Sequence, residues 1–206
     1  MRKLTFCLIL LLSSLSLFAS SISFSGGRSS LSLKEGKEEV VLSDGAKVSV
    51  DEIRIESNKI TLSGSGWMEV VCEGKTKILD LENKIEIRTS GLWFDRTEER
   101  MIISSWFEID DSKNEISATG NSLLFNMATG LLSLEKDVTL LKITDDGIMR
   151  CKAESVILDR DNQKISLRGN ASVVWNGDEY NAEAIYVNLE TEEISLEGRI
   201  KGSING

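Results

Sequence analysis

The sequence contains no histidine, and this absence excludes several kinds of chemistry. Serine–histidine and cysteine–histidine nucleophiles, histidine-ligated metals and histidine proton shuttles all require an imidazole. No glycine-rich phosphate loop is present, because "SGSGW" at 63–67 lies in strand-like sequence. Paired acids at 110–111, 145–146 and 192–193 fall in expected turns, where solvated carboxylates are ordinary, so a glycosidase is only a remote alternative. We predict no enzymatic activity, no metal site and no cofactor.

Proline is also absent, so nothing marks a linker, and no change of composition divides the chain. The chain starts with "MRK", an apolar run at 4–18 and the small residues "ASS" at 19–21, which together are typical of a cleaved signal peptide. The run is shorter than the roughly 20 residues that a membrane-spanning helix needs. We predict export, with a signal peptide at 1–21 and a single domain at 22–206. An uncleaved anchor is the alternative.

Cysteine is scarce, and only Cys72 and Cys151 lie beyond the leader. In an oxidising compartment these two residues could form one disulfide. Two small buried thiols fit the sequence equally well, and the spacing does not decide between the two states.

Positive charge is scarce as well. The chain has 24 Lys and Arg against 33 Asp and Glu, a net charge of −9 at pH 7. Such an acidic chain does not attract nucleic acid or anionic lipid surfaces through its overall field. We therefore expect no nucleic-acid partner.

The feature that the sequence has in abundance is strict alternation of apolar and polar residues. In segment 155–173, Val156, Leu158, Ile165 and Leu167 fall on one face of two strands, with the turn-forming "DRDNQK" between them. Leu158 should then lie opposite Ile165, and Val156 opposite Leu167. This pattern predicts a hairpin with one apolar face.

The same seven-residue spacing recurs along the chain. It joins Ile53/Ile60, Ile78/Ile85, Phe94/Met101, Ile109/Ile116, Phe125/Leu132, Leu158/Ile165 and Val187/Ile194, with Leu141/Ile148 as a weaker eighth pair. Glycine follows four residues after the second member at Gly64, Gly120, Gly169 and Gly198, which predicts a bulge or bend where a strand crosses to another sheet. No segment beyond the leader has helical periodicity. We predict an all-β fold of repeated hairpins.

Two segments resemble a known family. "AESVILDRDNQKISLRGNASV" at 153–173 and "AEAIYVNLETEEISLEGRIKG" at 182–202 are similar to the repeated signature of the periplasmic lipopolysaccharide-transport proteins, the LptA/OstA-like family. Segments 54–66 and 108–121 resemble the same signature, whereas 70–105 matches it poorly. The resemblance implies an open β-jellyroll, in which two antiparallel sheets form a slot and leave unpaired strands at both ends.

The resemblance also implies a function. It indicates a non-enzymatic periplasmic carrier or bridge that binds the acyl chains of lipopolysaccharide or a related glycolipid in an accessible hydrophobic trough. The implied partners are an inner-membrane ABC exporter complex, an outer-membrane translocon with OstA-like domains, and further copies of the chain in a head-to-tail homo-oligomer. The alternatives are an exported structural or adhesive β-protein and an LptC-like membrane-anchored member of the same pathway.

The residues expected to face the trough are apolar residues on the inward faces of the predicted hairpins. They are Ile53, Ile60, Phe107, Ile109, Ile116, Phe125, Leu132, Leu134, Val156, Leu158, Ile165, Leu167, Ile185, Val187, Ile194 and Leu196. Plain core packing is the alternative for each one taken singly, because every β-sandwich buries such residues.

Overall fold

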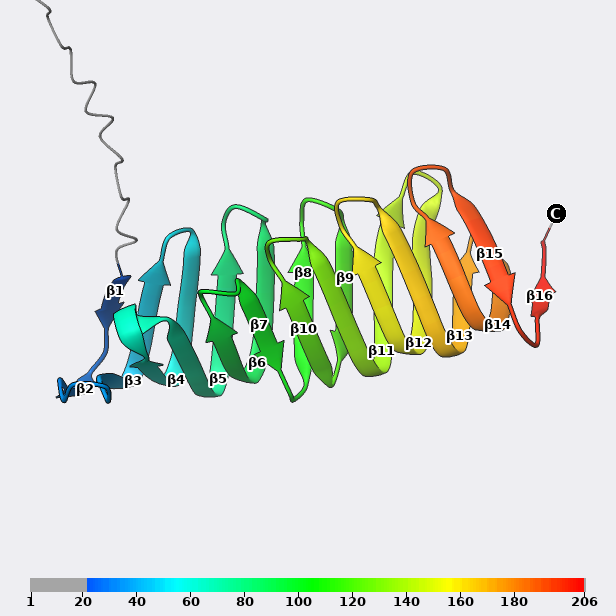
Figure 1. The fold of residues 1–206 in the computed structure, drawn as a ribbon. Coiled ribbons are helices and arrows are strands. Elements are labelled where there is room, and N and C mark those ends of the chain that lie inside the picture. Colours follow the sequence, from blue (N-terminus) through cyan, green and yellow to red (C-terminus); the bar gives the residue numbers. More distant parts are fainter. Residues whose placement is uncertain (1–21, 206) are drawn as a thin grey trace, which may run out of the picture.

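A computed structural model describes residues 22–205 as a long array of antiparallel strands (Figure 1). The predicted signal peptide at 1–21 lies outside the described residues. Within residues 22–205, no helix combines the length and the apolar character needed to cross a membrane. The one helical element is a short 3-10 helix, η1, at Ser65–Trp67. The all-β prediction is confirmed.

The array contains sixteen strands. Their bounds are β1 Ile22–Ser25, β2 Arg28–Ser32, β3 Glu39–Val50, β4 Ile53–Ser63, β5 Glu69–Asp80, β6 Ile85–Asp95, β7 Arg100–Ile103, β8 Phe107–Asp111, β9 Ile116–Gly120, β10 Ser122–Asn126, β11 Leu131–Thr144, β12 Gly147–Asp159, β13 Lys164–Trp175, β14 Asp178–Asn188, β15 Glu193–Glu197 and β16 Lys201–Ser203.

The strands form two facing sheets because the eight long strands bend in the middle and contribute one half to each sheet. Sheet 1 runs β1-β3-β4-β5-β6-β8-β9-β11-β12-β13-β14-β16, and sheet 2 runs β2-β3-β4-β5-β6-β7-β10-β11-β12-β13-β14-β15. The bends lie along one long border, which we call the bend edge. The hairpin turns of both sheets lie along the other border, the hairpin edge, which is uppermost in Figure 1.

The bends coincide with breaks in strand register. In β13 the register shifts between Arg168 and Ala171, where Gly169 has a φ of 77° that favours glycine. Gly120 and Gly198 likewise stand where the chain passes from one sheet to the other, so the bend prediction is confirmed at these three glycines. It is wrong at Gly64, which precedes η1 in a connection within sheet 2.

The predicted hairpin pairs are correct throughout sheet 2. Phe94/Met101, Phe125/Leu132, Leu158/Ile165 and Val187/Ile194 all lie directly opposite each other. The pair Ile53/Ile60 is wrong, because both residues belong to β4 and the polar residues between them form a bend instead of a turn.

In sheet 1 the predicted pairing is off by two residues. Ile78 pairs with Ile87 rather than Ile85, and Ile109 pairs with Ala118 rather than Ile116. Ile148 pairs with Ile143 rather than Leu141. At the ends of β5 and β8 the reason is a buried acid, since Asp80 and Asp111 occupy the inward positions opposite Ile85 and Ile116.

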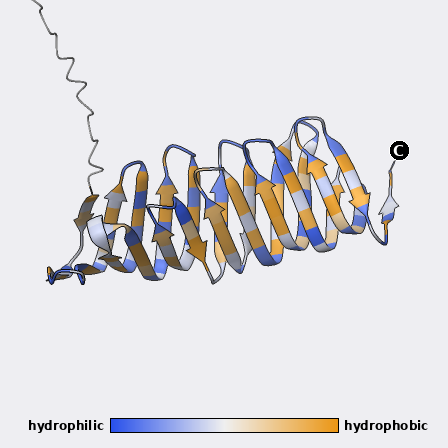
Figure 2. Cartoon of the chain, viewed as in Figure 1, coloured by the Kyte–Doolittle hydropathy of each residue, from blue (hydrophilic) through white to orange (hydrophobic). Residues whose placement is uncertain are grey.

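The core is the layer between the two sheets. Along each strand, buried apolar residues alternate with exposed polar ones, and the turns at the hairpin edge are predominantly hydrophilic (Figure 2). This alternation follows from the pleat, which directs successive side chains to opposite faces. The core therefore extends along the whole array as one continuous cluster.

Candidate functional site

The candidate site is the apolar layer between the sheets. The predicted trough residues Ile53, Phe107, Ile109 and Ile116 belong to sheet 1, and the other twelve belong to sheet 2. Fourteen of the sixteen are buried, and none of the fourteen is more than 8% exposed. Ile194 and Leu196, on the last strand of sheet 2, are partly buried.

Sheet 2 carries an unbroken row of directly paired apolar residues, one from each of eleven strands. We call it the sheet 2 ladder. It consists of Val40, Leu62, Val70, Phe94, Met101, Phe125, Leu132, Leu158, Ile165, Val187 and Ile194. At about 4.8 Å per strand, the row spans on the order of 48 Å.

Sheet 1 carries a matching row, the sheet 1 ladder. It consists of Val48, Ile55, Ile78, Ile87, Ile109, Ala118, Leu140, Cys151, Val173 and Tyr180. Most residues of this ladder were not predicted from the sequence, because the prediction considered only the arms of hairpins and not the other halves of the bent strands. The alternation of residues in "VTLL" at 138–141 and "ASVV" at 171–174 is the sequence pattern that indicates these inward-facing positions.

The layer is filled by its own side chains. The sequence prediction expected an accessible gap, whereas Phe107, Phe125, Leu134 and Ile165 have no exposed surface. The physical reason is that apolar faces without cargo bury each other, which is favourable by about 25 cal/mol per Å². A guest molecule can occupy this layer only if the sheets move apart.

The two long borders differ in how they join the sheets. At the bend edge the chain itself passes from sheet to sheet in every long strand. At the hairpin edge, the turns of sheet 1 face those of sheet 2. The turns of sheet 1 are residues 51–52, 81–84, 112–115, 145–146 and 176–177. The turns of sheet 2 are residues 64–68, 96–99, 127–130, 160–163 and 189–192. Within residues 22–205, no main-chain segment passes from sheet to sheet at this edge, so side-chain contacts alone join the sheets there.

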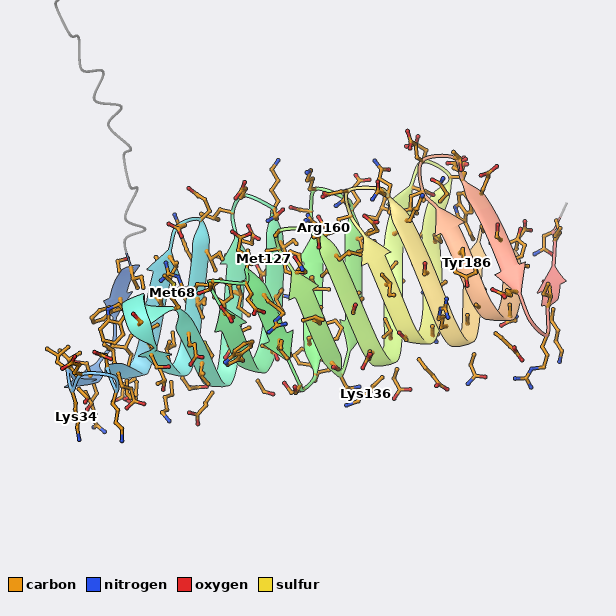
Figure 3. The ribbon with its side chains drawn as sticks, viewed as in Figure 1. Lys34, Met68, Met127, Lys136, Arg160 and Tyr186 are labelled. Atoms are coloured by element: carbon orange, nitrogen blue, oxygen red, sulfur yellow. The ribbon has the colours of Figure 1, made fainter. Side chains whose placement is uncertain are left out.

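A cleft of roughly 620 Å³ opens between the two rows of turns in the N-terminal half. Its apolar surface includes Ile53 and Phe94 from the core, together with Met68 and Met127 from the turns of sheet 2 (Figure 3). Its lining also includes acidic residues such as Glu52 and Glu82. The cleft therefore connects solvent at the hairpin edge with the apolar layer.

A buried group of polar side chains ties the two sheets together beside this cleft. Arg160, in the β12–β13 turn of sheet 2, donates from Nε to Oδ2 of Asp111 in sheet 1 at 2.6 Å. Its Nη1 and Nη2 donate to Oδ1 and the main-chain oxygen of Asn83 at 3.1 and 3.0 Å. We call these contacts the Arg160 bridge; Figure 3 labels Arg160 near the hairpin turns.

The surroundings of Asp111 keep it ionised. Burial raises the pKa of this carboxyl, but hydrogen bonds from Arg160 and Asn114 outweigh burial, so the pKa lies below its ordinary value. This group was not predicted from the sequence. The available signal was a recurring Asp-x-x-Asn turn at 80–83, 111–114 and 159–162, in which the Asn closes the turn on its Asp.

A second contact crosses the hairpin edge nearer the N-terminus. Arg96, in the β6–β7 turn of sheet 2, has an Nη2 atom 4.0 Å from Oδ2 of Asp51 in the β3–β4 turn of sheet 1. The same side chain donates to the main-chain oxygen of Trp67 at 3.1 Å. This contact is longer than the 2.6 Å contact of the Arg160 bridge. It is also more exposed, since 61% of the Asp51 side chain is accessible.

The two ends of the array are strand edges. In the described chain, β1 and β2 each pair with β3 alone, and β15 and β16 each pair with β14 alone. Their outer backbone groups therefore have no neighbouring strand within residues 22–205. Such edges are templates for the addition of another strand.

Of the two states that the sequence left open for Cys72 and Cys151, the structure has two buried thiols and not a disulfide. Both thiols are free and buried, and burial raises the pKa of each to about 12. They lie on β5 and β12, which are separated in both sheets by several strands. Within residues 22–205, no group of three or more Cys, Asp or Glu side chains could hold a metal ion.

No protein-family model matches the chain, and no curated protein matches it. Among solved structures, the chain is similar to the crystal structure of LptH, the LptA homologous periplasmic component of the conserved lipopolysaccharide transport device from Pseudomonas aeruginosa. The two sequences are 12% identical, the likeness covers 91% of this chain and 96% of that chain, and the TM-score is 0.29. At that TM-score the likeness assigns nothing to this chain, whose all-β fold rests on its own strands.

Proposed function

We propose that this protein is a non-enzymatic periplasmic carrier that holds acyl chains of lipopolysaccharide or a related glycolipid between its two sheets and passes the lipid towards the outer membrane. The observation that carries the proposal is the pair of apolar ladders. Eleven strands of sheet 2 and ten of sheet 1 present apolar residues to one shared layer. Each methylene buried there contributes about 0.8 kcal/mol.

The strand edges support a bridging role. Addition of a second copy, the edge of β1 and β2 against the edge of β15 and β16, would continue both sheets and both ladders from one molecule to the next. A head-to-tail row of copies would then extend the apolar layer between the inner and outer membranes, where an ABC exporter and a translocon with similar domains would be the partners.

Site-specific photo-crosslinking tests the carrier function. A benzophenone amino acid in place of Phe125 or Leu158 should crosslink to added lipopolysaccharide, because both positions face the apolar layer. The neighbouring positions Leu124 and Ile157 are matched controls, since they are 39% and 41% exposed and point away from the layer. A parallel experiment with a phospholipid shows whether the polar headgroup matters.

Crosslinking at 125 and 158 but not at 124 and 157 supports the proposal. If all four positions react equally or none reacts, the interior does not hold acyl chains. An exported structural protein that polymerises through its strand edges without cargo would then explain the structure better.

A further inference from the structure

The Arg160 bridge is unusual among the ion pairs of residues 22–205 because both partners are buried. Arg160 and Asp111 expose 2% and 3% of their side chains. In every other ion pair, at least one of the two side chains is 44% or more exposed. A buried ion pair contributes little net stability compared with apolar residues of the same volume. Its presence at the hairpin edge therefore needs a reason other than stability.

An ion pair and an apolar contact differ in the free energy that is needed to separate them when the hairpin edge opens. Apolar side chains that are pulled apart expose surface to water at a cost proportional to its area. Separated charges instead recover their hydration, which offsets much of the lost attraction. An ion pair therefore holds the two rows of turns in register while it is closed and allows them to separate at moderate cost.

The bridge stands between clefts along the same edge. Asn83 lines the larger cleft, and Arg160 lines a smaller one of about 130 Å³ on the other side. The walls of the two clefts include core residues, namely Ile53 and Phe94 in the first and Ile116 and Leu158 in the second. A third cleft of about 180 Å³, which Met149 lines, continues the series. If the bridge opened, these clefts would join into one groove above the ladders.

We propose that acyl chains enter the interior sideways through the hairpin edge, and that the Arg160 bridge is the contact that must open for them to enter. This inference rests on the proposed function, because it assumes that the interior takes acyl chains. A lateral slit suits an amphiphile, since the chain can pass between the turns while the polar headgroup stays in water. Passage through the ends of the array is the competing route.

A reversible covalent lock tests the inference. The variant N83C/R160C replaces the bridge by two thiols, which a short disulfide-forming bifunctional reagent can join and a reductant can release. Cys72 and Cys151 should not react, because both are buried and their pKa is about 12. Loading is measured as photo-crosslinking of lipopolysaccharide to a benzophenone amino acid at position 125, which lines none of the three clefts.

A second lock serves as the matched control. Ser133 and Ile157 lie directly opposite each other on the outer face of sheet 2, so the variant S133C/I157C places the same crosslink within one sheet. This crosslink does not join the two sheets and leaves the hairpin edge free. Circular dichroism and size-exclusion chromatography verify that both variants are folded before loading is measured.

The inference predicts that the lock across the edge abolishes loading, that reduction restores it, and that the control lock has no effect. Equal loading with the edge locked and unlocked would overturn the inference in favour of the end route while leaving the carrier function intact. Absence of loading in the unlocked protein with the native bridge would instead overturn the carrier function itself. The two failures are therefore distinguishable.

Discussion

Nε of Arg160 lies 2.6 Å from Oδ2 of Asp111, although 49 residues separate them in the sequence. Arg160 lies in the β12–β13 turn of sheet 2 and Asp111 ends strand β8 of sheet 1, and within residues 22–205 no main-chain connection joins the sheets at that border. The contact thus links the stability of the fold to the closure of the layer in which we place the cargo.

Loss of Arg160 should destabilise the protein strongly. The substitution Arg160→Ala leaves the Asp111 carboxylate buried without its main partner, and we expect a loss of about 3–5 kcal/mol in the free energy of unfolding, measured by urea denaturation. Arg168→Ala, on an exposed outer face, is the control and should change stability by no more than about 0.5 kcal/mol. Equal effects of the two substitutions would show that the bridge does not hold the edge.

Asp111 should make stability depend on pH in the acid range. Its pKa is lowered in the folded protein, so the stabilisation is present above the unfolded pKa of about 3.9 and is lost as pH falls through the folded pKa. Asp111→Asn should therefore show a smaller loss of stability between pH 7 and pH 3 than the native chain. Asp145→Asn, in an exposed turn, should retain the native dependence.

The two cysteines should be inert in the folded protein. Cys72 and Cys151 are 3% and 0% exposed, and the pKa of each is about 12, so almost no thiolate is present at neutral pH. A maleimide reagent should label neither residue under native conditions and both after unfolding in urea, as read by mass spectrometry. Labelling of neither residue after unfolding without a reductant would point to a disulfide and contradict the structure.

The bend of β13 should depend on glycine. At Gly169 the φ is 77°, and an added Cβ would lie 2.9 Å from the Cβ of Glu154. Gly169→Ala should therefore lower the free energy of unfolding by about 1–2 kcal/mol or more. Gly91→Ala is the matched change in β6, where the φ is ordinary and the nearest contact would be 3.4 Å, and it should cost much less.

The strand edge at the C-terminus should control assembly. A chain that ends at Ile200 lacks β16, the outer strand of sheet 1. If copies join end to end, analytical ultracentrifugation should show concentration-dependent oligomers for the native chain and a monomer for the shortened one. The substitution Lys201→Glu, which keeps the strand, separates a charge effect from loss of the edge.

The sequence by itself determined the all-β fold and which residues face inwards, because side-chain alternation is a local property of the pleated strand. It also determined the pairing of Leu158 with Ile165, since a short turn holds both arms of that hairpin. Only the tertiary structure decided that β4 bends where a hairpin was expected, and that Asp111 displaces the register in sheet 1. Only the tertiary structure brought Arg160 to Asp111, because contacts between sheets depend on how distant strands stack and leave no periodic trace in the chain.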